Sequence, residues 1–337
     1  MSDGFVEILT PFSAHGWAVA RDSGTTHVVA EHRGRVLGFA AVDIERPDLA
    51  QVGLQARAFR MAFAEPVPAR DLADVRVSFL ESTTPLPMSP GVVQAERPPT
   101  QVFVVGSPRS GTSAMSVCLA GALQVPCRGE LHAGPRFLQA AAALHGDPES
   151  SSDMVKLLAA EAAEKIVIDA TRRFYHLLHG SESFVDKTPG APMIKALPFL
   201  QICFPEARII FMRRNGISNI LSRMAKFGGS FAEHCADWAN AMLVWERARP
   251  VLRNVLEVEQ EVMLRDSDAV ARTVTQFLGR PEVEDDLALS LSLDTTERTG
   301  AGLDGSALAN TGWDGAEIEH FRRVCGPVMG RWGYPLE

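Results

Sequence analysis

The sequence predicts a small all-β sandwich followed by an α/β domain in which helices cover both faces of a parallel sheet. Three observations predict this order. Short strand-like segments fill the first 95 residues, a proline-rich stretch follows, and apolar strands alternate with helical segments from residue 101. Strands that are apolar throughout are typical of parallel sheets buried on both faces. We therefore expect a β domain over 1–95, a linker over 96–100 and an α/β domain over 101–337.

The N-terminal region is rich in Val, Phe and Ala with interleaved polar residues, a pattern that favours half-buried strands. Arg33-Gly34 lies between two such segments and predicts a tight hairpin turn. A sandwich is the simplest fold for several short antiparallel strands of this kind. The predicted strands are 5–9, 26–32, 36–44, 57–63 and 75–80.

From residue 101 the hydrophobic periodicity switches repeatedly between strand and helix. We expect Trp238 and Trp245 in the core, because they are seven residues apart on one predicted helix and so share a face. The predicted strands are 102–105, 183–187, 207–212 and 255–258. The predicted helices are 113–123, 153–178, 191–203, 217–227, one around 238–245, 268–278 and 315–332.

The composition excludes several classes of protein. A formal net charge of −8 argues against a general nucleic-acid binder, which needs a basic field over much of its surface. Neither a signal peptide nor an apolar run long enough to span a membrane is visible. Five scattered cysteines without zinc spacing predict reduced, mostly buried thiols, and so a cytoplasmic protein.

The segment VFVVGSPRSGTSAM, residues 102–115, predicts a buried strand, a glycine-containing turn and a helix start. Backbone N–H groups at such a turn converge on an anion, and Arg109 adds a charge that suits a tetrahedral oxyanion. The loop is not a Walker A motif, because Thr112 follows Gly111 where that motif has lysine. The candidate anion-binding residues of the loop are Arg109, Ser110, Gly111, Thr112 and Ser113.

This segment resembles the 5′-phosphosulfate loop of sulfotransferases that use 3′-phosphoadenosine-5′-phosphosulfate (PAPS). The resemblance implies a P-loop-like fold, sulfonate transfer from PAPS as the donor co-substrate, and no requirement for a metal. It covers about residues 101–335, and its match is weakest toward the end. The stretch 295–313, with Arg298, Gly300 and Gly302, occupies the place of the family's nucleotide-covering loop but lacks its usual phrase.

A second segment, ARIIFMRRNGISNILSRM, resembles the part of these enzymes that binds the 3′-phosphate. Arg214 precedes Ser222 by eight residues, so an arginine at a strand end and a serine in the next helix can converge on one phosphate. Arg213 is a rival for the same role, at a spacing one residue longer. The family often has Asp after the arginine, where this chain has Asn215.

Two further phrases resemble the tyrosylprotein-type sulfotransferases and their bacterial relatives. In FVDKTP, Lys187 matches the lysine that helps to hold the transferring sulfonate. In CRGELH, Glu130 matches the general base, 21 residues after Arg109, and His132 is the alternative base. The resemblance therefore gives the catalytic candidates Glu130, Arg109, Lys187 and His132.

The acceptor is not readable from these donor motifs. The phrases HGWAVARD, RGRVLGFAAV and RPDLAQVGL resemble a β-sandwich module that accompanies some bacterial glycosyltransferases and sulfotransferases. That association favours a hydroxyl on a saccharide, another cell-envelope molecule or a small molecule. Two alternatives remain: a P-loop kinase-like phosphotransferase, and a catalytically dead glycan-binding or scaffold protein.

Overall fold

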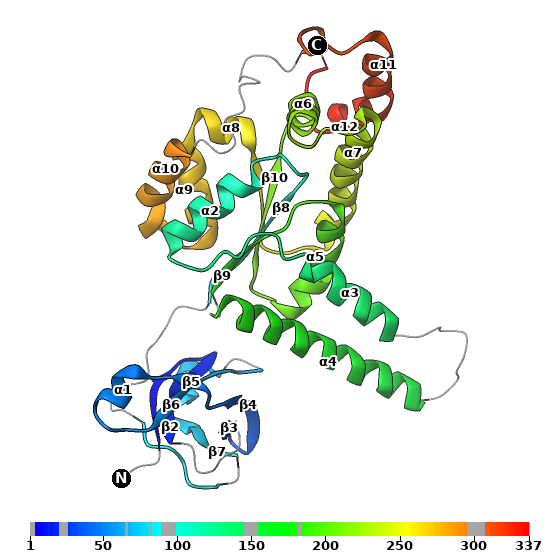
Figure 1. The fold of residues 1–337 in the computed structure, drawn as a ribbon. Helices are drawn as coiled ribbons and strands as arrows, with labels where there is room; N and C mark the ends of the chain where they lie inside the picture. The colour runs from blue at the N-terminus through cyan, green and yellow to red at the C-terminus, as the bar shows by residue number, and fades with distance from the viewer. Residues whose placement is uncertain are drawn as a thin grey trace. The chain divides into compact units, whose positions relative to one another are not determined.

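The computed structural model of the chain describes residues 4–19, 26–64, 67–80, 82–88, 99–144, 154–180, 183–294 and 307–336. They form two compact units, Met1–Pro99 and Thr100–Glu337, each with its own hydrophobic core (Figure 1). Each unit is described by itself below.

The first unit is a β-sandwich of two antiparallel sheets, as the sequence predicts. One sheet has the strand order β1-β2-β6-β5 and the other β4-β3-β7. Arg33 and Gly34 connect β3 to β4, and both have positive φ (50° and 80°), the geometry of the two-residue hairpin turn that was expected. The elements are β1 (Gly4–Leu9), β2 (Ser13–Val19), β3 (His27–His32), β4 (Arg35–Ala41), β5 (Ile44–Glu45), α1 (Pro47–Gln51), β6 (Ala56–Ala62) and β7 (Val75–Phe79).

The sequence analysis missed β2 (Ser13–Val19). β2 contains His15 and Gly16 and lacks a run of β-branched residues, yet it pairs with both β1 and β6. Within the proline-rich stretch, the Val6 N–H donates to the Pro87 carbonyl at 2.9 Å, and Leu86 is buried in the sandwich core. Proline lacks an N–H but can accept, so this segment closes the unit.

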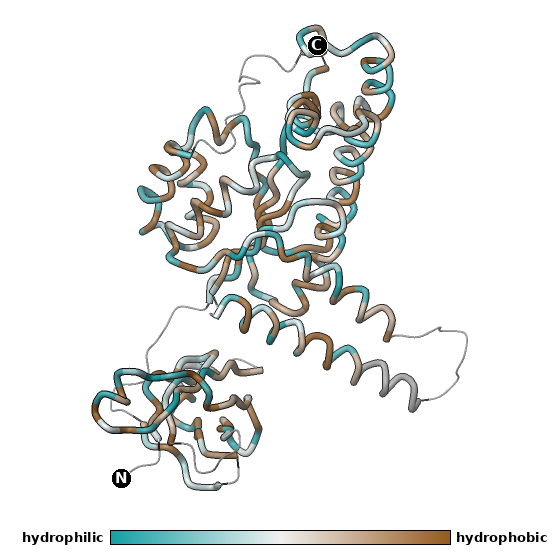
Figure 2. Tube along the Cα trace, viewed as in Figure 1, coloured by the Kyte–Doolittle hydropathy of each residue, from teal (hydrophilic) through white to brown (hydrophobic). Residues whose placement is uncertain are grey.

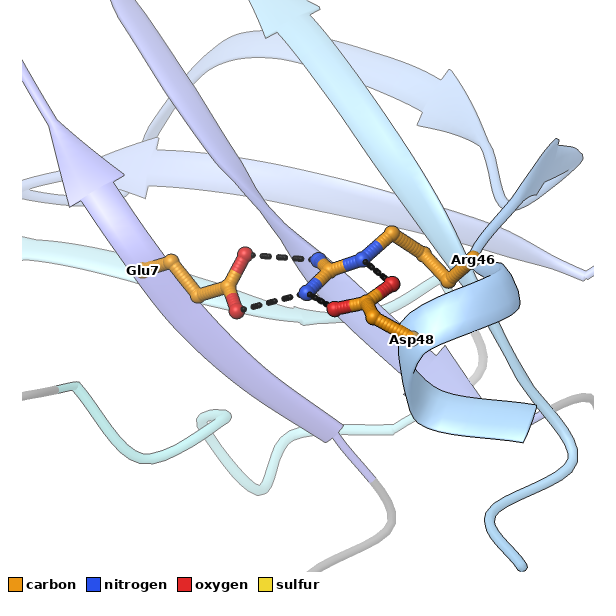
Figure 3. Close-up of polar contacts among 3 residues, drawn as sticks. All are labelled: Glu7, Arg46 and Asp48. Carbon is orange, nitrogen blue, oxygen red and sulfur yellow. Dashed lines mark hydrogen bonds and ion pairs between the residues drawn. The ribbon is translucent and has the colours of Figure 1, made fainter. Parts of the chain in front are cut away.

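An arginine network ties the start of α1 to β1 (Figure 3). The Arg46 guanidinium donates to both carboxylate oxygens of Glu7, at 2.8 and 3.3 Å, and to both oxygens of Asp48, at 2.8 and 2.7 Å. The adjacent guanidinium lowers the pKa of the Asp48 carboxyl to about 2. Two bidentate contacts on one planar group fix the direction in which the chain leaves β5.

The second unit contains a parallel sheet with the strand order β11-β10-β8-β9. The elements are β8 (Gln101–Gly106), α2 (Thr112–Leu123), α3 (Ala133–Leu144), α4 (Met154–His179), β9 (Phe184–Lys187), α5 (Ala191–Cys203), β10 (Arg208–Arg213), α6 (Gly216–Phe227), α7 (Phe231–Ala248), β11 (Val255–Glu259), α8 (Gln260–Arg265), α9 (Ser267–Leu278), α10 (Glu284–Leu293), α11 (Gly315–Val324) and α12 (Gly326–Arg331).

Helices cover both faces of this sheet, as the continuous apolar strands predict (Figure 1). Val102 and Val104 of β8 pack with α2, α9 and α10, whereas Phe103 and Val105 pack with α5 and α7 on the opposite face. The sheet strands are correspondingly among the most hydrophobic parts of the unit (Figure 2). The expected core position of Trp245 is confirmed, because its ring stacks on Phe211 with centroids 4.0 Å apart.

Several helices depart from the sequence prediction. The short helix α8 was not predicted. Neither were α3, whose glycine, proline and alanine-rich sequence resembles a loop, and α10, whose first turn is acidic and suits a helix N-terminus. The single helix expected over 315–332 is two helices, α11 and α12. The break lies at Gly326-Pro327, because Pro327 has no N–H with which to continue the hydrogen bonds of α11.

The strand order determines where a ligand can bind. From β8 the chain crosses to β9 on one side, and β10 then lies on the other side of β8. Such a switch point leaves a crevice at the carboxyl ends of the two diverging strands, here β8 and β10. Gly106 ends β8 with φ 154°, and a Cβ there would lie 2.2 Å from the Met212 carbonyl oxygen of β10. The close approach of the two strands therefore requires glycine.

We predict that Gly106→Ala lowers the free energy of unfolding by at least about 2 kcal/mol, because both the backbone conformation and the strand spacing oppose a side chain. Chemical denaturation of the purified chain measures this. The matched control is Gly121→Ala in α2, where a Cβ meets nothing within 4 Å and stability should rise by up to about 1 kcal/mol. A Gly106→Ala variant as stable as the wild type would contradict the requirement.

Candidate functional site

The loop after β8 has the geometry of an anion-binding turn. Arg109 (φ 70°) and Gly111 (φ 85°) both lie in the left-handed region, and Gly111 is the N-cap of α2. Left-handed residues in such a turn direct successive N–H groups toward one point, beside the positive end of the α2 dipole. Ser107 and Ser110 are buried beneath the turn. The loop residues predicted from the sequence are thus placed at a helix start, as expected.

Helix α6 supports this loop through a residue that the sequence analysis missed. The Asn219 amide donates to the Pro108 carbonyl at 2.9 Å and to the Ser110 hydroxyl at 3.0 Å. Asn219 is fully buried and lies one turn before Ser222 on the same helix. The sequence signal that could have identified Asn219 is its position as a polar residue one helical turn before Ser222. The contact fixes the loop against the helix that carries Ser222.

The structure brings Arg109, Arg214 and Ser222 together beyond the carboxyl ends of β8 and β10. Arg109 Nε donates to Ser222 Oγ at 3.1 Å, and Arg214 Nη1 donates to the Arg109 carbonyl at 2.9 Å. The backbone of Arg214 is held in turn, because Trp238 Nε1 donates to its carbonyl at 3.3 Å. Two guanidinium groups and a hydroxyl from three separate elements therefore converge next to the anion-binding turn.

Arg213 and Arg214 have different environments in the structure. Arg213 forms an ion pair with Glu259 (Nη2 to Oε2, 2.7 Å) and donates to the Tyr334 hydroxyl at 3.3 Å. Its guanidinium also lies over the rings of Trp332 and Tyr334, at 5.8 and 5.5 Å from their centroids. Arg213 therefore anchors the C-terminal segment, and Arg214 is the arginine at the loop.

The start of α6 is fixed by two contacts. Asn215 is the N-cap, and its side chain accepts from the Ile217 N–H at 2.8 Å. Its own N–H donates to Glu261 Oε1 at 3.0 Å. Burial raises the pKa of the Glu261 carboxyl. Asn215, where the family often has aspartate, thus caps the helix without adding a negative charge beside Arg214.

A second group of predicted residues lies at the carboxyl end of β9. Lys187 Nζ contacts Glu130 Oε1 at 2.5 Å, and His132 Nε2 lies 3.6 Å from Glu130 Oε2. The Lys187 side chain is 14% exposed, whereas Glu130 is 42% exposed and can meet an incoming molecule. The structure therefore places a carboxylate between an ammonium group and an imidazole at the surface of the domain.

The segment that carries Glu130 is attached to the strand that carries Lys187. Cys127 forms an isolated parallel β-bridge with Val185 of β9, and the Val185 N–H donates to the Pro126 carbonyl at 3.0 Å. After Lys187 the chain turns back to the anion loop, because the Gly190 N–H donates to the Gly106 carbonyl at 2.8 Å. The Glu130 and Lys187 pair is therefore tied by backbone contacts to the start of the loop.

Asp186 and Thr188 flank Lys187, and both are fully buried. Thr188 Oγ1 donates to Asp186 Oδ1 at 3.1 Å, and burial raises the pKa of the Asp186 carboxyl to about 7. Buried carboxyls with raised pKa values are common at functional sites. The sequence analysis quoted this aspartate within the DKTP phrase but gave it no role.

The two groups lie on either side of the loop at one edge of the sheet. β8 is the neighbour of both β9 and β10, and parallel strands are about 5 Å apart. An anion on the loop could therefore reach Arg214 and Ser222 on one side and Lys187 on the other. Arg298, Gly300 and Gly302, predicted near the nucleotide, lie outside the described residues.

Comparison with known proteins decides the family. The sulfotransferase family matches residues 99–285, more than half of the chain. The chain belongs to the sulfotransferase family. Its matched region begins before β8 and includes both groups of site residues.

Two curated proteins are similar to this sulfotransferase-family chain. Protein-tyrosine sulfotransferase A of Caenorhabditis elegans is 25% identical over 197 residues, 53% of this chain and 50% of that protein. Protein-tyrosine sulfotransferase 1 of Danio rerio is 26% identical over 193 residues, 53% of each. The chain thus spans about half the length of the curated relatives it matches.

Solved structures similar to the chain include other sulfotransferases. Sulfotransferase STF9 from Mycobacterium avium has a TM-score of 0.46 at 14% identity, and the similarity covers 72% of this chain and 79% of that one. The sulfotransferase domain of the Synechococcus PCC 7002 olefin synthase has a TM-score of 0.41 at 20% identity, over 62% and 82%.

The five cysteines are free thiols, four of them buried and Cys127 partly buried, as expected. Among the described residues, no helix has the length and hydropathy to cross a membrane. Within the same residues, no group of three or more His, Cys, Asp or Glu side chains could hold a metal ion.

We predict that Asp186 makes the stability of the protein depend on pH. Its folded-state pKa lies above the unfolded value of 3.8, so its contribution is fully present below about pH 4 and is lost as pH rises through about 7. Relative to Asp186→Asn, the wild type should lose about 2 to 3 kcal/mol of unfolding free energy between pH 5 and pH 8. Denaturation of both proteins across that range tests this, and parallel curves would contradict it.

Proposed function

We propose that this protein transfers a sulfonate group from PAPS to a hydroxyl acceptor. The observation that carries the proposal is the convergence of Arg109, Arg214 and Ser222 beside an anion-binding turn at the switch point of the sheet. A single phosphate would need only the turn. A second cluster of hydrogen-bond donors, one strand away from the turn, suits a nucleotide with phosphates at two positions. Membership of the sulfotransferase family favours PAPS as that nucleotide.

Each end of the donor has matching groups in this proposal. Arg214 and Ser222 bind the 3′-phosphate, which distinguishes PAPS from ATP. Backbone N–H groups of residues 109–113, with the hydroxyls of Ser110, Thr112 and Ser113, bind the 5′-phosphosulfate. Arg109 lies between the two sites, since its carbonyl contacts Arg214 and its Nε contacts Ser222.

The transfer step uses the second cluster. Glu130 takes the proton from the acceptor hydroxyl as its oxygen attacks sulfur, and the bond between sulfur and the bridging oxygen of the 5′-phosphate breaks. The 3′-phosphoadenosine 5′-phosphate (PAP) leaves. Lys187 and Arg109 stabilise the charge on the sulfonate and the bridging oxygen. When Lys187 turns from Glu130 toward the sulfonate, Glu130 is free to accept the proton. His132, 3.6 Å from Glu130, is the alternative base.

The acceptor is a hydroxyl, on a saccharide or another molecule. The curated relatives are named for protein tyrosine, but the chain spans only about half of each of them. We therefore extend to this chain only the need for an acceptor oxygen that can lose a proton. A phosphotransferase is disfavoured because Thr112 occupies the position of the Walker lysine. An inactive scaffold would have no need of the close Glu130 and Lys187 pair.

Thermal-shift measurements test the donor assignment. PAP should raise the melting temperature of the purified chain more than ADP or AMP at equal concentration, because only PAP carries the 3′-phosphate. Arg214→Ala should abolish that preference. An equal response to ADP and PAP, or a response to ATP with magnesium alone, would reject PAPS as the donor.

Transfer of labelled sulfonate from PAPS to fractionated glycans, lipids and metabolites tests the reaction. Arg109→Ala, Lys187→Ala and Glu130→Gln should each lower turnover about a hundredfold or more, because each removes an interaction used in the transition state. Lys195→Ala is the matched control, since Lys195 is exposed on α5, outside both clusters. Near-wild-type activity of Glu130→Gln would reject Glu130 as the base and leave His132.

A further inference from the structure

We propose that Tyr175 and Asp186 are positioning residues that set the geometry of the Glu130 and Lys187 pair from beneath. This inference rests on the proposed function. Tyr175 belongs to α4, Asp186 to β9, and both are fully buried. Neither side chain faces the surface where the acceptor would bind, so each acts only through its neighbours.

Asp186 fixes the backbone on both sides of Lys187. Successive side chains of a strand point to opposite faces, so Asp186 and Thr188 enter the core on the face that Lys187 avoids. The 3.1 Å hydrogen bond between their side chains closes this connection beneath Lys187. The lysine backbone is therefore held at two points, and its side chain is directed away from the core toward Glu130.

The ring of Tyr175 is held rigidly by aromatic side chains. It lies at an edge-on angle to Phe103 (centroids 5.8 Å apart) and Phe204 (5.5 Å), and stacks on Phe184 of β9 at 5.4 Å. Such contacts leave the ring no room to turn. The hydroxyl is consequently fixed in place, even though it has no hydrogen-bond partner within ordinary geometric limits in the described part of the structure.

The surroundings of this hydroxyl connect the two segments of the transfer site. Burial raises the pKa of the Tyr175 hydroxyl, and the nearby Asp186 carboxylate raises it further. The ring of Tyr175 stacks on Phe184 of β9, and the adjacent Phe174 of α4 packs on Phe137 of α3 with centroids 5.3 Å apart. The segment of α4 around Tyr175 therefore contacts both the strand of Lys187 and the helix that follows Glu130.

Gly134 fixes the position of α3, the helix that follows Glu130. A Cβ at this position would lie 2.9 Å from Leu200 and 3.0 Å from Met193, so the first turn of α3 packs directly on α5. The segment with Glu130 is held at its other end by the bridge between Cys127 and Val185. Tyr175 therefore sits where a small displacement would change the spacing between Glu130 and Lys187.

Tyr175 and Asp186 are polar residues in fully buried positions, and such burial requires an explanation. Burying a carboxyl and a hydroxyl with incomplete hydrogen bonding costs stability, and apolar residues of similar size would pack there at lower cost. Buried polar groups are retained in some proteins because they specify one arrangement among several. Here the arrangement they would specify is that of the base and the cation directly above them.

Donor discrimination tests the inference without any need for an identified acceptor. Lys187 holds the sulfonate in the proposed function, so the wild type should bind PAPS more tightly than PAP, and Lys187→Ala should lose that preference. Tyr175→Phe keeps the ring and removes only the hydroxyl. It should reduce the ratio of PAPS affinity to PAP affinity about three- to tenfold while leaving PAP affinity unchanged, as measured by calorimetry.

Tyr334→Phe is the matched control, because Tyr334 is the only other tyrosine of the chain and its buried hydroxyl contacts Arg213. It should leave the ratio unchanged. Asp186→Asn and Thr188→Val should lower the ratio of PAPS affinity to PAP affinity as Tyr175→Phe does. These two variants test the inference if Tyr175→Phe does not fold. A change in melting temperature with the wild-type ratio retained in all three variants would overturn the positioning role.

The outcomes separate this inference from the proposed function. If the wild type binds neither PAP nor PAPS, the proposed function fails, and the positioning role fails with it. If the wild type prefers PAPS and Lys187→Ala abolishes the preference, the proposed function stands. In that case, an unchanged ratio in Tyr175→Phe, Asp186→Asn and Thr188→Val would reject the positioning role alone.

Discussion

The close approach of β8 and β10 is the constraint on which the rest of the site depends. Gly106 lets the end of β8 lie against the Met212 carbonyl, and the chain then leaves the two strands in different directions. A parallel sheet places all its carboxyl ends at one edge, so the loop after β8 is flanked by the ends of β9 and β10. Residues more than a hundred positions apart, such as Arg109 and Ser222, meet there without any long connection.

Charged residues of the site lie on both sides of the loop after β8. Lys187 is paired with Glu130, whereas Arg214 Nη1 donates to the Arg109 carbonyl and Arg109 Nε donates to the Ser222 hydroxyl. Arg213, one residue away, is neutralised by Glu259. In the proposed function, the donor would therefore meet two arginines on the β10 side of the loop and the Lys187 and Glu130 pair on the β9 side. The proposal thus assigns nucleotide binding and proton transfer to residues at the ends of different strands.

Much of this arrangement was predictable from the sequence because it depends on local patterns. Apolar strands, the turn at Arg33-Gly34 and the spacing of Arg214 and Ser222 are all readable over short distances. The missed elements depend on distant partners. β2 is a strand because two neighbours pair with it, and α3 is a helix because Gly134 fits closely against α5. Asn219 is identified as a support of the loop only when α6 is seen against Ser110.

The different environments of Arg213 and Arg214 agree with the spacing that favoured Arg214, and their physical cause lies outside the motif. Adjacent residues at a strand end point to opposite sides, so only one of them can face the loop. Which one does so depends on Glu259 of β11 and on Tyr334 near the C-terminus, neither of which belongs to the motif. The C-terminal segment occupies the guanidinium of Arg213 and thereby leaves Arg214 as the arginine beside the loop. The position of Arg213 thus depends on packing that lies outside the motif.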